Sequence, residues 1–219
     1  VHRFRLMREG KNPVTRAIRY TISCIKQLYF GIFGKDARQC DVMFISSTPP
    51  IQGAMAAIIK KIRRIPFIYN LQDIFPDYLV GTGMTKKGSI LWKIGRVIEN
   101  FTYRNADKII VISEDFKQNL LDKGVPESKI EVIYNWVDEK AVVPIAKEEN
   151  DLYEELDIPR DKFNVVYAGN FGNAQNIDVI LKAADKLKAH SDINFALFGS
   201  GGLKDKFVEA YGGSEKIKI

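Results

Sequence analysis

The feature that most constrains this chain is a regular alternation of short apolar runs with helical segments. Apolar runs over residues 41–46, 67–71, 108–112 and 130–134 predict buried strands. Helical spacing, or helix start and stop signals, marks residues 14–33, 51–64, 87–103 and 113–124. Parallel strands need helical crossovers of this kind, so the sequence predicts an α/β fold with a doubly wound parallel sheet.

The alternation stops in a charged stretch and then starts again. The stretch over residues 138–162 contains Pro144 and Pro159, and it is followed by strand patterns at 164–168, 194–198 and from 217, with helices at 176–189 and 203–211. We therefore predict a Rossmann-like domain over 1–137, a linker over 138–162, and the beginning of a second Rossmann-like domain over 163–219. Because the chain starts with Val1 and ends on a strand pattern, we expect it to be truncated at both ends.

Composition narrows the class of protein. The chain has 219 residues, 46% of them hydrophobic, and no apolar run approaches the ~20 residues of a spanning helix, so a cytoplasmic globular protein is expected. Two cysteines provide neither a disulfide framework nor a zinc cluster, and DxD and HExxH motifs are missing. No metal and no cofactor are therefore expected.

The net charge of +6 suits nucleic acid, an anionic membrane or a phosphorylated substrate, and it also suits an ordinary solvated face. No reading helix or aromatic stacking motif accompanies it, so nucleic acid is not expected as a partner. The helix over 14–33 could dock peripherally on the inner face of the plasma membrane, or its apolar side could pack on the sheet. The basic residues of this helix are Arg16, Arg19 and Lys26. The apolar residues around them are Ile18, Ile22, Ile25, Tyr29, Phe30 and Ile32. The helix over 87–103 likewise gathers Leu91, Ile94, Ile98 and Phe101 on one face.

Loops at the carboxyl ends of parallel strands are where such sheets bind ligands. Two of these loops, Gly169-Asn170-Phe171-Gly172 and Gly199-Ser200-Gly201-Gly202, are predicted to follow a strand and precede a helix. Glycine allows backbone amides to approach an anion, and a helix N-terminus favours a phosphate there. Two adjacent glycine turns favour a phosphate-bearing ligand, although tight turns also use glycine for geometry alone.

Two carboxylates, Asp73 and Asp77, follow the strand over 67–71. A carboxylate in this place can orient a substrate hydroxyl or accept its proton. Either residue could instead cap a helix or close an Asx turn.

These segments, taken in order, resemble the family-four retaining glycosyltransferases of the GT-B fold, in the branch that builds bacterial capsule, O-antigen and exopolysaccharide. The segments are LQDIFPD (71–77), ADKIIVISEDF (106–116), VIYNWVD (132–138), VVYAGNFG (165–172) and FALFGSGG (195–202). The resemblance implies a metal-independent transferase that uses a nucleoside-diphosphate sugar, with UDP as the expected nucleotide. The implied acceptor is lipid-linked or a glycan.

The resemblance also implies roles for individual residues. Asp73 matches the residue that faces the sugar and is the catalytic candidate, while Asn135 and Asp138 match the interdomain cleft. The donor-binding positions are Gly169, Asn170 and Gly172 near the diphosphate, and Gly199, Ser200 and Gly201 near the nucleoside.

The sequence departs from the family pattern at the diphosphate. Asn170 stands where many members have an arginine, and Gln175 and Asn176 stand in the region of a lysine. The paired glutamates that hold the donor sugar would lie beyond Ile219, so we expect the fragment itself to be inactive. Two alternatives remain open at this point: a non-catalytic GT-B subunit that binds a partner transferase, and a nucleotide-sugar epimerase of related fold.

Overall fold

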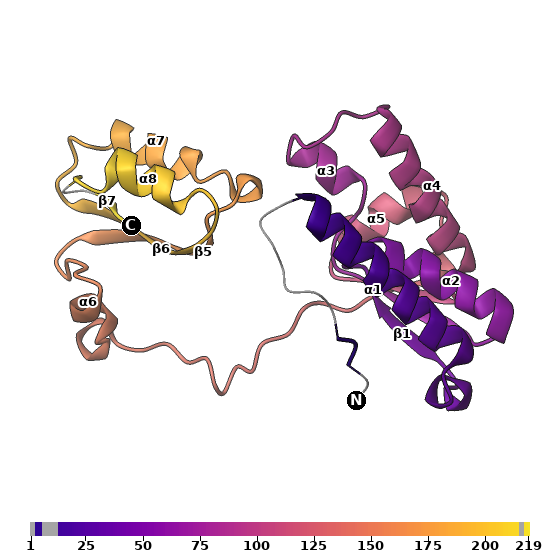
Figure 1. Ribbon diagram of the computed structural model, residues 1–219. Coiled ribbons are helices and arrows are strands. Elements are labelled where there is room, and N and C mark those ends of the chain that lie inside the picture. The colour runs from indigo at the N-terminus through magenta and orange to yellow at the C-terminus, as the bar shows by residue number, and fades with distance from the viewer. Residues whose placement is uncertain (1–2, 6–12, 215–216) are drawn as a thin grey trace. The chain divides into compact units, whose positions relative to one another are not determined.

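The computed structural model describes residues 3–5, 13–214 and 217–219 (Figure 1). The chain forms two compact units, Val1–Trp136 and Val137–Ile219. Each unit contains its own parallel sheet and its own hydrophobic core.

The first unit is built on four parallel strands in the order β1-β2-β3-β4. The strands are β1 (Met43–Ser46), β2 (Phe67–Leu71), β3 (Lys108–Val111) and β4 (Ile130–Val132). The predicted parallel α/β fold is therefore confirmed. The strands lie across the sheet in the same order as in the sequence, and crossovers between parallel strands are right-handed. The connecting helices therefore cover the same face of the sheet.

The helices of the first unit mostly start and stop where the sequence predicts. They are α1 (Pro13–Phe33), α2 (Ile51–Arg63), α4 (Ile90–Asn105) and α5 (Glu114–Asp122). Ser113 caps α5 as expected, since its side chain accepts a hydrogen bond from the amide of Phe116. The short helices α3 (Asp77–Gly81), η1 (Asp36–Gln39) and η2 (Glu127–Lys129) were not predicted, because a single turn leaves no periodicity to detect.

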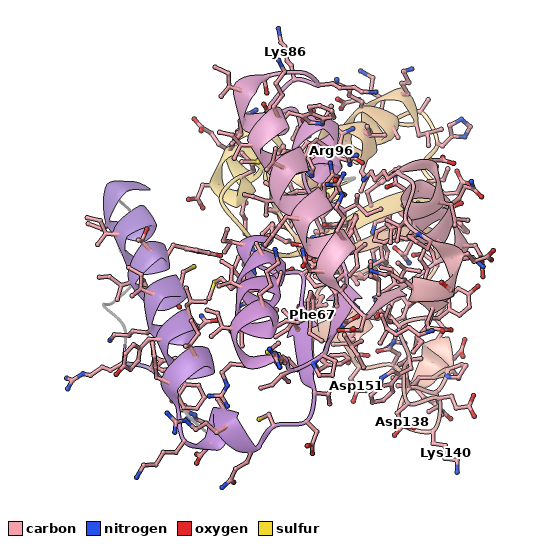
Figure 2. The ribbon with its side chains drawn as sticks, turned by 90° about the vertical axis from the view of Figure 1, so that its right-hand side faces the viewer. Phe67, Lys86, Arg96, Asp138, Lys140 and Asp151 are labelled. Carbon is pink, nitrogen blue, oxygen red and sulfur yellow. The ribbon has the colours of Figure 1, made fainter. Side chains whose placement is uncertain are left out.

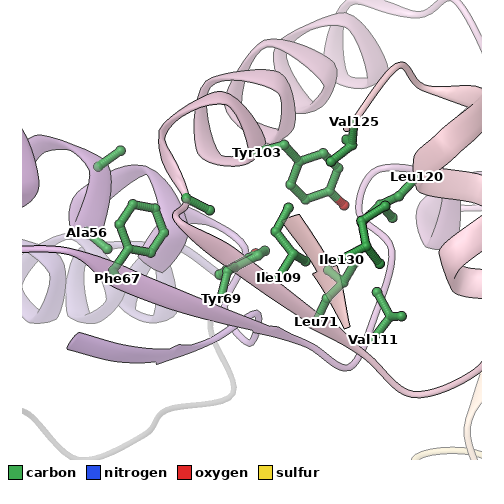
Figure 3. Packing of buried hydrophobic residues seen from close by; sticks show 12 residues of the cluster. Ala56, Phe67, Tyr69, Leu71, Tyr103, Ile109, Val111, Leu120, Val125 and Ile130 are labelled. Carbon is green, nitrogen blue, oxygen red and sulfur yellow. The ribbon is translucent and has the colours of Figure 1, made fainter. Parts of the chain in front are cut away.

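The core of the first unit lies between the sheet and the helices α2, α4 and α5 (Figure 3). Its fully buried side chains include Phe67, Leu71, Ile109, Val111 and Leu120. Burial of a side chain of this size contributes about 1.5–3 kcal/mol, so the strand residues that alternate inward hold the helices on the sheet.

The apolar face predicted for α4 is buried only in its C-terminal half, where Ile98 is partly buried and Phe101 packs against the core. Leu91 and Ile94 are half exposed, whereas Gly95, Glu99 and Thr102 are buried. The reason is a close approach of α2 to α4, where a Cβ atom at Gly53 would lie 2.3 Å from Cγ2 of Thr102. Small side chains allow this contact, and Leu91 and Ile94 lie on the outer side of the helix.

Helix α1 does not pack its apolar stripe on the sheet. Ile18, Ile25 and Tyr29 are 46%, 62% and 66% exposed. The helix contacts α2 instead, where Gly31 lies against Ile59, and a cavity of about 390 Å³ opens between α1, α2 and β1. The sheet-packing alternative is therefore wrong for Ile18, Ile25 and Tyr29, whereas Ile22, Phe30 and Ile32 are partly buried. The side chain of Arg16 lies outside the described residues.

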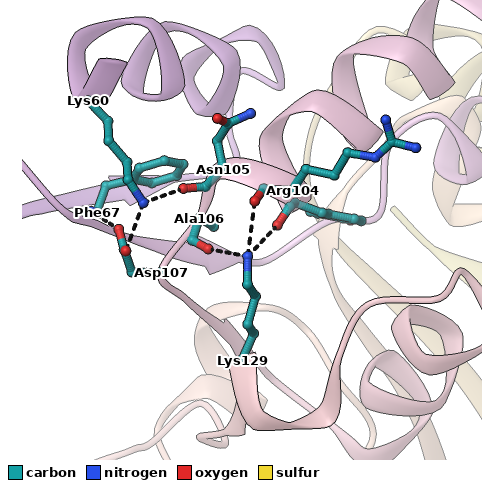
Figure 4. Close-up of polar contacts among 8 residues, drawn as sticks. Lys60, Phe67, Arg104, Asn105, Ala106, Asp107 and Lys129 are labelled. Carbon is teal, nitrogen blue, oxygen red and sulfur yellow. Dashed lines mark hydrogen bonds and ion pairs between the residues drawn. The ribbon is translucent and has the colours of Figure 1, made fainter. Parts of the chain in front are cut away.

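Two lysines satisfy carbonyl groups at the C-terminus of α4 (Figure 4). The Lys60 ammonium donates to the Asn105 carbonyl and pairs with Asp107 at 2.7 Å, and Lys129 donates to the carbonyls of Arg104 and Ala106. Cations at a helix C-terminus also complement its dipole. Partial burial raises the pKa of Asp107, but hydrogen bonds from Lys60 and the Phe67 amide outweigh it and lower the pKa below its usual value.

The second unit has three parallel strands in the order β5-β6-β7, backed by two helices. The elements are β5 (Phe163–Asn170), α7 (Asp178–Lys186), β6 (Ile193–Ser200), α8 (Lys204–Tyr211) and β7 (Ile217–Lys218), with a single turn of 3-10 helix, η4 (Asn173–Gln175), before α7. Phe171, Leu181, Leu197 and Phe207 fill its core.

The charged stretch before β5 contains η3 (Lys147–Glu149) and α6 (Leu152–Glu155). The Arg160 guanidinium donates to the carbonyls of Lys147 and Asn150, and Asp157 forms an ion pair with Lys218 of β7. These contacts attach the stretch to the second unit.

Candidate functional site

A buried serine joins two loops at the carboxyl edge of the first sheet. The Ser47 side chain is 2% exposed, and its Oγ accepts hydrogen bonds from the amides of Gln72 at 2.9 Å and Asp73 at 3.3 Å. The Ser47 amide in turn donates to the Asn70 carbonyl at 2.9 Å. The loop after β1 therefore positions the backbone that carries Asp73.

The carboxylate of Asp73 is exposed and accepts a long hydrogen bond, 3.4 Å, from the Thr48 hydroxyl. Neither Asp73 nor Asp77 caps a helix, because α3 begins after Pro76 without a side-chain cap and Asp77 pairs with Lys123 at 2.7 Å. The capping alternative is therefore wrong. Asp73 presents its carboxylate at the edge where open parallel sheets bind ligands.

The two residues assigned to the interdomain cleft fall in different units. Asn135 is exposed at the end of the first unit, and Asp138 begins the second. Asp138 Oδ1 accepts hydrogen bonds from the amides of Lys140 and Ala141 at 3.0 and 3.3 Å, which is an Asx turn. Their placement in a cleft stays a prediction.

The two glycine motifs of the second unit lie side by side, but they begin inside the strands. β5 extends to Asn170 and β6 to Ser200, with Gly169 opposite Gly199 in the register. The prediction that both motifs follow the strands is corrected here, because the ladder pairs their first two residues. A Cβ atom at Gly199 would lie 1.7 Å from the Gly169 carbonyl oxygen, so glycine is required for this strand contact.

The side chain of Asn170 lies between the two turns. A Cβ atom at Gly172 would lie 2.8 Å from its Nδ2, and one at Gly201 would lie 2.5 Å from its Oδ1. Gly201 has a φ of 151°, which favours glycine at this position as well. The structure thus brings together Gly169, Asn170, Gly172, Gly199, Ser200 and Gly201, all predicted as donor-binding residues.

A lysine that the sequence interpretation missed belongs to the same turns. The Lys204 ammonium, from the first turn of α8, donates to the Gly199 carbonyl at 3.0 Å. A cation in the first turn of a helix opposes the helix dipole, and a bound anion would relieve that repulsion. The available signal was a lysine two residues after a glycine turn, at a position where helices favour acidic residues.

The structure also sets limits on other kinds of site. Over residues 3–5, 13–214 and 217–219, no three His, Cys, Asp or Glu side chains gather in a way that could hold a metal ion. Within the same ranges, no helix combines the length and the hydropathy that crossing a membrane requires.

Comparison with known proteins identifies the family. The model of Glycosyltransferase Family 4 matches residues 2–141, so the chain belongs to that family. WbjE of Pseudomonas aeruginosa, described as a probable glycosyltransferase, is 30% identical over 171 residues, which is 77% of this chain and 42% of WbjE. WcaI of Escherichia coli K12, whose name refers to colanic acid biosynthesis, is 27% identical over 67% of this chain and 37% of its own length.

Solved structures confirm the fold class. HepE of Anabaena, in complex with UDP-glucose, superposes with a TM-score of 0.65 at 18% identity, over 94% of this chain and 52% of HepE. A sucrose-phosphate synthase of Thermosynechococcus elongatus gives a TM-score of 0.66 at 14% identity, over 96% of this chain and 51% of that one. The chain therefore has the GT-B type of fold with incomplete Rossmann-like domains, and it spans about half the length of these proteins. The family match favours a transferase over an epimerase or a non-catalytic subunit.

Proposed function

We propose that this chain is part of a retaining, metal-independent glycosyltransferase. It transfers a sugar from a UDP-linked donor to a lipid-linked or glycan acceptor in bacterial surface polysaccharide synthesis. The observation that carries the proposal is the pair of interlocked glycine turns with Lys204, in a chain of the glycosyltransferase family. The UDP-glucose bound to HepE and the polysaccharide named for WcaI support the donor and the pathway class.

The donor diphosphate would meet backbone amides of the two turns and the ammonium of Lys204. Oriented amides and a nearby cation stabilise the negative charge that develops on a departing diphosphate, so this chemistry requires no metal ion. Lys204 would supply the positive charge that is missing at Asn170 and at Gln175 and Asn176.

Asp73 would orient a hydroxyl of the transferred sugar. Ser47 holds the backbone of Asp73 in place, while the carboxylate itself has one long hydrogen bond and is free to change partners. A rigid backbone with an available carboxylate suits a positioning role, because misplaced reacting groups cost about a factor of 100 in rate.

The test uses the full-length protein and its turnover of UDP-sugars. Lys204→Gln should raise KM for the donor by about 10- to 100-fold, since charge-assisted hydrogen bonds are worth about 1.5–3 kcal/mol. Lys206→Gln, an exposed lysine on the same helix, is the matched control and should leave KM unchanged. Equal KM values for the two variants would remove Lys204 from the donor site.

Asp73→Ala should lower kcat by about 100-fold while circular dichroism and thermal unfolding stay as in the wild type. Wild-type turnover in this variant would contradict the role of Asp73. No turnover of any UDP-sugar by the wild-type full-length protein would contradict the proposed function itself.

We also propose that the enzyme works at the inner face of the plasma membrane as a peripheral protein. A lipid-linked acceptor would be presented there, and the net charge of +6 suits anionic lipid.

A further inference from the structure

Helix α4 and the loop before it expose large apolar side chains. Met84, Ile90, Leu91, Ile94 and Val97 are each half or more exposed, and Ile90 reaches 79%. Ile90, Ile94 and Val97 follow the i, i+4, i+7 spacing, so they share one stripe of the helix. Exposed apolar residues that cluster in this way are typical of an interaction surface, whereas single exposed apolar residues are common on any protein.

The charges around this stripe all have one sign. The segment 78–98 has no Asp or Glu, and it carries Lys86, Lys87, Lys93 and Arg96. The three lysines are exposed, and Lys86 points away from the chain beyond the start of α4 (Figure 2). The outer side of α4 is therefore both apolar and cationic.

The acidic residue of α4 is removed from this surface. Glu99 is 5% exposed and forms ion pairs with Lys123 at 2.8 Å and with Arg96. Its carboxylate offsets the charges of Arg96 and Lys123, so the exposed positive charge beside the apolar stripe comes from Lys86, Lys87 and Lys93.

The positive charge continues toward the C-terminus of the helix. Arg96, Asn100 and Arg104 follow a four-residue spacing and lead into a cavity of about 440 Å³ that Lys123 and Lys129 also line. The lining of this cavity includes four cationic side chains and no acidic one. Arg96 and Lys123 of this lining pair with Glu99, and Lys123 also pairs with Asp77, so an anionic group that approaches α4 meets its favourable charge mainly at Lys86, Lys87 and Lys93.

We propose that residues 84–97 form a docking surface for an anionic lipid bilayer. Apolar side chains beside lysines, without acidic residues, match the acyl boundary and the charged headgroups of such a membrane. A second copy of the same surface is a poor partner, because it would bring cations against cations. The inference rests on the proposed function in its form with a lipid-linked acceptor, and it assigns access to that acceptor to α4.

Helix α1 is the competing surface, since it also exposes an apolar stripe. It lies near the edge strand β1 and lines an apolar cavity of about 390 Å³ together with α2 and β1. Helix α4 packs against α2 and is joined to α5 by the pair between Glu99 and Lys123, so its exposed side faces away from the sheet.

Vesicle flotation of the full-length protein tests the proposal. Vesicles of phosphatidylcholine with about 30% phosphatidylglycerol should carry the protein in about 0.1 M salt, and vesicles of phosphatidylcholine alone should not. Combined substitution of Lys86, Lys87 and Lys93 by Gln should lower the partition coefficient by about 100-fold, at about fivefold per lysine. Ile94→Gln with Val97→Gln should lower it by about tenfold or more.

Two control variants test the location. Val179→Gln changes an equally exposed apolar residue of α7 and should bind like the wild type. Tyr29→Gln changes the stripe of α1 and should also bind like the wild type. Loss of binding in Tyr29→Gln with retention in the α4 variants would overturn the assignment to α4.

Turnover of a water-soluble acceptor without vesicles separates this proposal from the proposed function. A wild-type protein that turns over the soluble acceptor but does not float overturns docking alone. If it fails to float and instead dimerises through Ile94 and Val97 by light scattering, the surface is an interface between copies and the proposal is wrong. Flotation without turnover on any acceptor would contradict the proposed function and leave the binding surface standing.

Discussion

Replacing Ser47 with alanine should loosen the loop that carries Asp73. The substitution removes a buried oxygen that accepts hydrogen bonds from the amides of Gln72 and Asp73. Because the site is 2% exposed, water cannot easily replace that oxygen. A buried amide without a partner costs about 1–3 kcal/mol, and the bond to Asp73 is at the long end of the range, so the loss should be about 2 kcal/mol in total.

Three measurements on the full-length protein test the loss of these hydrogen bonds. Urea unfolding should show a midpoint about 1 M lower for a slope of about 2 kcal/mol/M. Hydrogen exchange should accelerate in peptides that cover residues 70–77, because the amides of this loop lose their acceptor. Turnover should fall by about tenfold or more as the carboxylate of Asp73 loses its fixed position.

Ser46→Ala is the matched control, because it removes the same atom from an exposed neighbour whose Oγ has a 3.5 Å contact with the Thr48 amide. It should change stability by less than about 0.5 kcal/mol. If Ser47→Ala matches this control in stability, exchange and turnover, then Ser47 does not hold the loop and the reasoning fails.

Three further predictions concern backbone geometry and buried charge. Gly199→Ala should abolish donor binding, as seen by calorimetry with UDP, because its Cβ would collide with the Gly169 carbonyl and separate β5 from β6; wild-type affinity would contradict this. Burial raises the pKa of Glu99, although Lys123 and Arg96 act to lower it. The folded protein therefore loses stability as pH rises above the ordinary value of 4.5, where the carboxyl group ionises. Over that range Glu99→Gln should become more stable relative to the wild type, as measured by urea titrations at several pH values. The pKa of Asp107 is lowered, so the stability that this carboxylate adds is present above pH 3.8 and is lost as pH falls below that value. Asp107→Asn should therefore be less stable than the wild type at neutral pH and equally stable in strong acid. A difference in unfolding free energy that stays the same at every pH would refute the pairing with Lys60.

The strands and helices could be predicted because their signals are local. β2 begins at Phe67 and ends at Leu71 as predicted, since Pro66 stops the preceding helix and the apolar run is short. Ser113 caps α5 through an amide three residues away, which is a short-range contact. Such features depend on neighbours in the sequence, so periodicity and stop residues are enough to locate them.

The candidate site could be predicted only in outline. The glycine motifs and Asp73 stand at the carboxyl ends of strands, and the parallel topology places them there. The contributions of Ser47 and Lys204 were missed, because each acts through a group that belongs to a different turn or loop. A serine at the end of a strand and a lysine at the start of a helix have no spacing that reports such a partner.

The sequence by itself determined the order of the elements, their parallel pairing and the residues available at the ligand edge. Only the tertiary structure decided which residues of α4 are buried. Gly53 meets Thr102 across two helices, and this contact turns Leu91 and Ile94 of α4 outward. The physical reason is that helix packing depends on the closest approach of two backbones, which small residues far apart in the chain set together.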